Sequence, residues 1–205
     1  KYQFYAEALK ILNQSEIPYL VGGGLAVHIY AEIQREVHDL DIFCKAGDAQ
    51  RIMKLFMEKD FQSQVIDPRW ISKVYKNDDF VDLIFNSVNS LCPVDDSWFT
   101  HAQDKELFGV NTKVVGPEEL IWCKIYIQDR THFDWPDINH LILKQGKNID
   151  WKHILNRLEQ HWPLLLGGLL NFRFVYPFDI EIIPKWLMDE LIEKRNVGSY
   201  FLKPH

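Results

Sequence analysis

The chain has 205 residues, of which 47% are hydrophobic, and a formal net charge of −6 at pH 7. This length and apolar content are sufficient for one large domain or two small ones, each with its own core. The net charge argues against nonspecific binding of nucleic acid, because such binding depends on clustered Lys and Arg. No segment approaches the ~18 consecutive apolar residues of a membrane span, so no membrane contact is expected.

The cysteines indicate a reducing compartment. Cys44, Cys92 and Cys123 are odd in number and widely spaced, without a C-x-x-C pair. This usage is typical of free thiols and argues against a disulfide framework or a zinc site. The chain begins at Lys1 without Met, so native residues can precede it, and no secretory signal is recognised at its start. We therefore expect a cytoplasmic protein.

Hydrophobic periodicity predicts the elements of the first half in chain order. An amphipathic helix is expected over residues 3–14. A strand at 19–21, a glycine turn, a helix at 24–32 and a strand carrying Asp39 and Asp41 follow. The elements predicted after them are a helix with Asp48 as its N-cap, three strands at 61–66, 71–75 and 80–85 with a turn at 77–79, a helical turn at 97–102, and a hairpin at 106–115.

The pattern changes to helices at Pro117. Proline suits the first position of a helix, and Glu118 and Glu119 in the first turn suit the positive end of its dipole. We expect this helix to continue to about Arg130, and we expect residues 164–174 to form a buried helix. The predicted domains are therefore a mixed α/β domain over residues 1–116 and a helical domain over residues 117–205.

Asp39 and Asp41 lie two residues apart on a predicted strand. Alternate side chains of a strand point to the same face, so the two carboxylates project together, about 7 Å apart, from ~3.3 Å of rise per residue. They repel each other unless a cation lies between them. A hard divalent cation such as Mg²⁺ takes oxygen ligands readily, so this spacing predicts half of a metal site. A lone Asp-x-Asp is, on the other hand, usually an exposed polar face.

The other half of the predicted site is the glycine turn. Gly22 and Gly23 end the first strand and begin a helix. Glycine tolerates tight turns and leaves backbone N–H groups uncovered, and the N-terminus of a helix favours phosphate. A lone Gly-Gly is usually just a turn, and it is the combination with the aspartates that favours a nucleotide.

In this order, the residues resemble the nucleotidyltransferase superfamily, whose fold is shared with DNA polymerase beta. The family pattern is a strand, Gly-Gly, a helix and then Arg-x-x-x-Asp-h-Asp-h, where h is apolar, and here Arg35 precedes Asp39 and Asp41. A third family carboxylate follows on a neighbouring strand, and Asp82 within Val-Asp-Leu matches it. One departure is Val37, where many relatives carry Thr. The resemblance implies an α+β fold with a mixed sheet flanked by helices, followed by an all-helical C-terminal domain.

A second pattern resembles several nucleotidyltransferases, including abortive-infection toxins. It is Glu-x-x-x-x-Lys, then Arg, then Asp-x-x-Asp at the start of a helix, matched here by Glu119, Lys124, Arg130, Asp134 and Asp137. The resemblance implies that Lys124 approaches the nucleotide phosphates or the acceptor. Two ordinary alternatives are that Lys124 is an exposed helix residue and that Asp134 is an N-cap.

The resemblance also implies an activity. Gly22 and Gly23 would hold the triphosphate of an NTP, ATP in the first instance, and Arg35 would neutralise phosphate charge unless it pairs with a surface Glu. Asp39 and Asp41 would hold Mg²⁺ or Mn²⁺. Asp82 would share a second metal or accept the proton of an acceptor hydroxyl. A nucleoside monophosphate would then be transferred and pyrophosphate released.

The acceptor is not specified by these residues. A small molecule, as for lincosamide and aminoglycoside nucleotidyltransferases, suits the acidic composition of residues 1–116, which attracts cations. A protein or tRNA acceptor, as for the toxin relatives, is the other option. A different class of function is a non-catalytic nucleotide-binding regulator or a toxin-antitoxin-type component, and a structural partner of another chain, including a second copy, is a third. The C-terminal tail resembles uncharacterised bacterial nucleotidyltransferases and suggests no chemistry.

Overall fold

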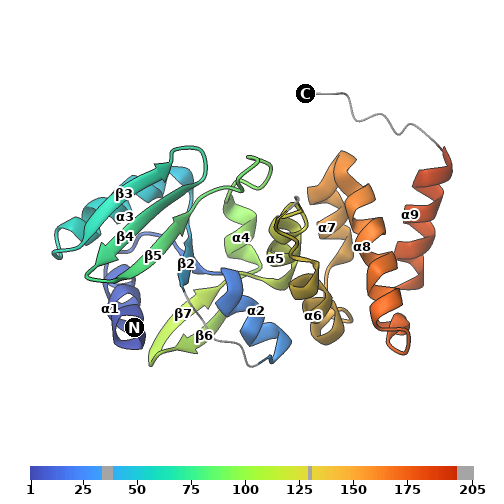
Figure 1. Cartoon of the computed structure of the whole chain (residues 1–205), viewed down its shortest axis with the longest axis horizontal. Coiled ribbons are helices and arrows are strands. Elements are labelled where there is room, and N and C mark those ends of the chain that lie inside the picture. Colours follow the sequence, from blue (N-terminus) through green and yellow to red (C-terminus); the bar gives the residue numbers. More distant parts are fainter. Residues whose placement is uncertain (34–38, 129–130, 198–205) are drawn as a thin grey trace. The chain divides into compact units, whose positions relative to one another are not determined.

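The computed structural model describes residues 1–33, 39–128 and 131–197. Its contacts divide the chain into two compact units, Lys1–Leu120 and Ile121–His205. The first contains a seven-stranded mixed sheet with helices, and the second contains helices (Figure 1). The predicted α+β fold with a helical C-terminal part is confirmed.

The sheet of the first unit has the strand order β3-β4-β5-β2-β1-β7-β6. β2 runs parallel to β5 and antiparallel to β1, while β1 runs parallel to β7. The other three neighbouring pairs, β3 with β4, β4 with β5 and β6 with β7, are antiparallel. The strands are β1 (Leu20–Val21), β2 (Leu40–Phe43), β3 (Gln62–Asp67), β4 (Ile71–Lys76), β5 (Asp79–Ile84), β6 (Gln103–Leu107) and β7 (Val110–Val114).

Helix α1 (Tyr2–Asn13) packs as its periodicity predicts. Tyr5, Ala8, Leu9 and Leu12 are each at most 1% exposed. Burying a leucine side chain contributes roughly 1.5–3 kcal/mol, so this one face is sufficient to hold the helix against the sheet.

Helix α3 (Ala46–Met57) packs on the same side of the sheet as α1. The ring of Phe61, next to β3, lies 5.9 Å from the ring of Phe4 in α1 and 5.0 Å from that of Phe56 in α3. Side chains of a strand alternate between faces. The opposite face of the central strands is therefore available to polar side chains.

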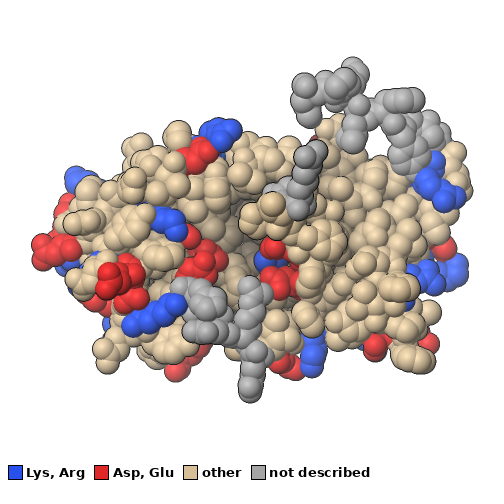
Figure 2. All heavy atoms as spheres, in the orientation of Figure 1, with Lys and Arg blue, Asp and Glu red and all other residues tan. Residues whose placement is uncertain are grey.

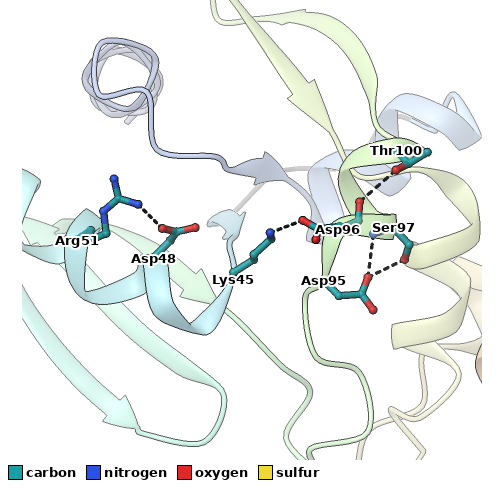
Figure 3. A network of polar contacts seen from close by, with 7 residues as sticks. All are labelled: Lys45, Asp48, Arg51, Asp95, Asp96, Ser97 and Thr100. Carbon is teal, nitrogen blue, oxygen red and sulfur yellow. Dashed lines mark hydrogen bonds and ion pairs between the residues drawn. The ribbon is translucent and has the colours of Figure 1, made fainter.

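Two short helices complete the first unit. α2 (Gly23–Ala31) begins directly after β1, and α4 (Asp96–Thr100) packs the fully buried ring of Trp98 on Phe43 of β2, with centroids 5.2 Å apart. Asp95 caps α4 by accepting bonds from the backbone N–H of Ser97 at 3.0 Å and from its hydroxyl at 2.7 Å (Figure 3).

The prediction of Asp48 as the N-cap of α3 is wrong. The helix begins at Ala46, with Lys45 at the N-cap and no capping side-chain bond. Asp48 lies in the first turn, where the dipole favours an acid, and pairs with Arg51 at 2.6 Å (Figure 3). The ammonium of Lys45 contacts Asp96 of α4, which ties the start of α3 to α4.

Helix α5 (Pro117–Lys124) is shorter than predicted. Its last turn is closed by a bond from the N–H of Ile127 to the carbonyl of Lys124, at 2.9 Å, and the chain then folds back through a bridge between Gln128 and Phe133. The helix therefore ends at Lys124. Arg130, to which it was predicted to continue, lies outside the described residues.

The second unit contains the remaining helices. The helix predicted over residues 164–174 is found within α8 (Trp162–Val175), but it is buried only on one stripe, formed by Leu165, Leu169 and Phe172, whereas Leu170 and Phe174 are 52% and 85% exposed. No described helix is long and apolar enough to cross a membrane. The elements are α6 (Trp135–Gln145), α7 (Trp151–Leu158), η1 (Glu159–His161), α8 (Trp162–Val175), η2 (Ile180–Ile182) and α9 (Lys185–Val197).

Candidate active site

Three carboxylates meet on neighbouring strands of the sheet. Asp41 of β2 is the register partner of Asp82 of β5, and Asp39 directly precedes β2. Each of the three offers an oxygen within 4.8 Å of the other two. Parallel pairing points register partners to the same face. The sheet therefore brings together carboxylates that are about forty residues apart in the chain.

Asp82 is the most buried of the three, at 7% exposure. Burial raises the pKa of its carboxyl, and the negative charge of Asp39 acts in the same direction, while the ammonium of Lys73 acts in the opposite one. Lys73 Nζ lies 2.7 Å from Asp82 Oδ1. The ammonium of Lys73 therefore offsets only part of the charge gathered in the site.

Gly23 forms a cradle beside the aspartates. Its φ of +59° is in the left-handed region, and a Cβ built on it would lie 1.6 Å from Asp41 Oδ2. Only a residue without a side chain fits both the backbone and the space. Asp41 therefore packs directly on the backbone at the start of α2.

Gly22 is also closely packed. Its N–H donates to the carbonyl of Asp41 at 2.9 Å, and a Cβ there would lie 2.4 Å from the ring of Phe43. Phe43 in turn stacks on Trp98. The glycine turn and the aspartate strand are thus fixed to each other through backbone bonding and an aromatic stack.

The donor set fits a hard divalent cation. It consists of carboxylate oxygens, the ligands that Mg²⁺ and Mn²⁺ prefer, and their mutual distances are within the span of one or two ions. The Gly23 cradle holds one of these carboxylates in a fixed place. Acidic and basic side chains are interspersed among the described residues of the face in Figure 2, and no broad basic surface covers it.

Lys124 is buried rather than exposed. Lys124 is 7% exposed, and its Nζ lies 2.6 Å from Asp134 Oδ2 and 2.9 Å from Asp137 Oδ2. Burial lowers the pKa of the ammonium, but the two carboxylates outweigh this and raise its pKa above the ordinary value. Asp134 occupies the N-cap position of α6 without a capping bond. The alternative of an exposed lysine is therefore wrong, whereas Asp134 does occupy the N-cap position of α6, with Asp137 in its first turn, and it binds Lys124 as well.

Of the other residues named from the sequence, the structure places Glu119 but does not describe Arg35 or Val37. Glu119 is fully buried and bonds His101 Nδ1 at 3.1 Å. Arg35 lies outside the described residues, as does Val37. The structure brings together Asp39, Asp41 and Asp82 with the glycine turn, and it groups Lys124 with Asp134 and Asp137 in a second cluster.

The sequence prediction missed Lys73. This residue lies on β4 directly opposite Asp82 of β5. A signal was available, since a two-residue turn at Asn77 and Asp78 pairs residue 73 with residue 82. The predicted three-residue turn at 77–79 does not give this pairing. The observed β5 begins at Asp79.

Comparison with known proteins identifies the family of this chain. A family described as "Nucleotidyl transferase of unknown function (DUF2204)" matches residues 1–162. A search of curated proteins found no match.

Among solved structures, the chain is similar to the antibiotic-resistance factor ANT(2'')-Ia in solution, with a TM-score of 0.54 and 11% identity over 84% of this chain and 96% of that one. It is similar to ANT(2'')-Ia in complex with adenylyl-2''-tobramycin, with a TM-score of 0.51 and 11% identity over 85% and 98%. The lincosamide antibiotic adenylyltransferase LnuA, bound to lincomycin, gives a TM-score of 0.47 and 17% identity over 68% and 94%.

At these identities the structural likeness shows the fold, while the family match shows membership. Because that match covers most of the chain, from the first helix to the start of α8, this protein belongs to the nucleotidyl transferase family DUF2204.

Proposed function

We propose that the protein is a metal-dependent nucleotidyltransferase that moves a nucleoside monophosphate from an NTP, with ATP the first to test, to a hydroxyl of an acceptor. The observation that supports this most is the cluster of Asp39, Asp41 and Asp82, whose oxygens lie within 4.8 Å of one another beside Gly23. Family membership supports the reaction class.

In this proposal the glycine turn receives the triphosphate. The backbone at Gly22 and Gly23 carries no side chain between the phosphates and the start of α2, and the positive end of a helix favours anions. Asp39 and Asp41 would hold Mg²⁺ or Mn²⁺, which when bound supplies a Lewis acid that offsets phosphate charge. Arg35 is proposed to add positive charge to the phosphates.

Asp82 is proposed to act on the acceptor, either beside a second metal or as the base. The acceptor oxygen would form a bond to the α-phosphorus, and the bond from that phosphorus to the bridging oxygen would break. The electron pair leaves with pyrophosphate, and the hydroxyl proton passes to Asp82. Lys124 is proposed to assist at the phosphates or the acceptor, in an orientation set by Asp134 and Asp137.

A small molecule is the acceptor class that we propose first. ANT(2'')-Ia, a similar structure, is described in complex with adenylyl-2''-tobramycin, an adenylylated aminoglycoside. Protein and tRNA hydroxyls are the other classes to screen. A regulator or toxin-antitoxin-type component that binds nucleotide without turnover is the rival function, and the presence of all three carboxylates argues against it, because a degenerate site commonly loses one.

The experiment is an ATP titration by calorimetry with Mg²⁺ and with EDTA, followed by a pyrophosphate-release screen over acceptor pools. Mg²⁺-dependent binding that is lost in Asp41→Asn supports the site. The control is Asp104→Asn, whose side chain is 84% exposed and pairs only loosely with Lys113, at 3.2 Å. Equal binding by wild type and Asp41→Asn would refute the assignment, while binding without pyrophosphate release from any pool would favour the regulator.

A further inference from the structure

Lys73 is an ammonium built into the aspartate cluster. It lies on β4, paired in register with Asp82 of β5, so the two side chains project from the same face of adjacent strands. Its Nζ lies 2.7 Å from Asp82 Oδ1. Lys73 therefore contacts the carboxylate that completes the cluster with Asp39 and Asp41.

The position of this ammonium is fixed from two sides. Besides the carboxylate, Nζ lies 3.9 Å from the ring centroid of Phe80, two residues before Asp82 on the same face. The ring face attracts a cation. The side chain of Lys73 is only 23% exposed and that of Asp82 11%. A half-buried pair of this kind is screened less by salt than a surface pair.

We propose that Lys73 is the resident counter-ion of the third carboxylate, and that its ammonium makes a divalent cation bind more weakly at Asp82 than at the Asp39 and Asp41 pair. This inference rests on the proposed metal-dependent function and adds a residue that sets how the site loads. The tighter metal position would use the carboxylates of Asp39 and Asp41. A cation at the weaker position, beside Asp82, would be repelled by the ammonium of Lys73.

The expected size follows from Coulomb repulsion. For a divalent cation and an ammonium taken to be about 5 Å apart, repulsion weakens binding on the order of tenfold even with the dielectric constant of water. Lys73 has a second consequence: before metal binds, it offsets part of the charge that three neighbouring carboxylates place in one site.

The chain offers a matched control in Lys76. This lysine lies on the same strand, pairs with a carboxylate, Glu7, at 2.6 Å, and lies 4.5 Å from an aromatic ring, that of Phe61. It is three residues from Lys73, so it projects from the opposite face, toward α1. The two lysines thus have the same kinds of partner, but only one of them contacts the aspartate cluster.

The test is a Mn²⁺ binding isotherm, followed by the paramagnetic resonance of free Mn²⁺, with a non-hydrolysable ATP analogue present. Wild type is expected to show a tighter and a weaker class of site. Lys73→Met should tighten the weaker class about tenfold or more and the tighter class by less, because Coulomb repulsion falls with distance. Lys73→Arg, which keeps the charge, and Lys76→Met should both bind as wild type does. Lys73→Gln serves as the neutral variant if Lys73→Met does not fold.

Each outcome is decisive. Isotherms of Lys73→Met and Lys73→Gln that match wild type overturn the inference and leave the proposed function intact. Equal tightening in Lys73→Arg also overturns it, because geometry rather than charge would then be responsible. Wild type that binds no Mn²⁺ in the presence of the analogue overturns the proposed function, and this inference with it.

Discussion

Asp41 and Asp82 are register partners on two parallel neighbouring strands, although they are 41 positions apart in the chain. The hairpin of β4 and β5 brings Lys73 opposite the same Asp82. One cross-section of the sheet therefore contains two carboxylates and an ammonium, and Gly23 packs on its edge. The predictions below examine separate parts of this arrangement and of the Lys124 cluster.

Gly23→Ala is expected to lower both stability and metal binding. The new methyl group would meet Asp41 Oδ2, and the φ of +59° is unfavourable for alanine by about 1–2 kcal/mol. Gly109→Ala is the matched control, since its φ is +75° but open space surrounds its Cβ position. Urea denaturation should show a backbone cost for both variants and a larger total cost for Gly23→Ala, and only Gly23→Ala should lose Mn²⁺ binding. Equal Mn²⁺ binding by both would mean that Asp41 moves aside without consequence.

Asp82→Asn is expected to impair turnover more than nucleotide binding. The amide keeps the volume of the carboxylate but removes its charge and its basic oxygen, so pyrophosphate release should fall by roughly 10²- to 10⁴-fold. ATP affinity, measured by calorimetry, should change little because the glycine turn and the Asp39 and Asp41 pair remain. The control is Asp79→Asn, on the same strand but three residues away and therefore on the opposite face. Turnover within a few-fold of wild type would remove Asp82 from the chemistry.

Lys124→Met is expected to cost about 3 kcal/mol of unfolding free energy at pH 7, because it leaves two carboxylates beside a buried position without their cation. The control is Lys185→Met, whose side chain is 88% exposed and pairs with Asp189, and which should change stability by less than about 1 kcal/mol. Urea denaturation followed by tryptophan fluorescence measures both. A small cost for Lys124→Met would mean that water satisfies Asp134 and Asp137.

The same pair gives a pH dependence with a definite sign. The pKa of Lys124 is raised in the folded protein, so its stabilising contribution is complete below the unfolded value of about 10.4. It is lost as the pH rises through the folded pKa. The difference in unfolding free energy between wild type and Lys124→Met should therefore be constant from pH 7 to 9 and shrink at higher pH. A difference that grows with pH would contradict the assignment.

Cys44 is expected to resist alkylation in the folded protein. Burial raises the pKa of its thiol to about 12, so at pH 8 only about one molecule in 10⁴ carries the reactive thiolate. All three cysteines are thiols outside any disulfide, and Cys123 is the least buried of them. Peptide mapping after iodoacetamide treatment should show Cys123 labelled far ahead of Cys44, and all three labelled in urea. Comparable native rates would indicate local opening around β2.

The sequence by itself determined the local features. The face of α1 follows from its 3.6-residue period, and the glycine turn before α2 follows from residue types that tolerate its backbone. The order of the glycine turn and of Asp39, Asp41 and Asp82 along the chain carried the family resemblance, and that resemblance implied the α+β class. These features depend on residues that are close together in the sequence, so they can be predicted without knowing the tertiary structure.

The tertiary structure decided the rest, because pairing across strands depends on distant residues. A turn one residue shorter than predicted places Lys73, rather than its neighbour, opposite Asp82. The burial of Lys124, at the end of α5, depends on Asp134 and Asp137, whose carboxylates contact its ammonium in the folded chain. Likewise, Asp48 is not the N-cap of α3 because the helix begins at Ala46, so that the N-cap falls three residues earlier, at Lys45. In each case local propensity allowed several answers, and long-range packing and charge selected one.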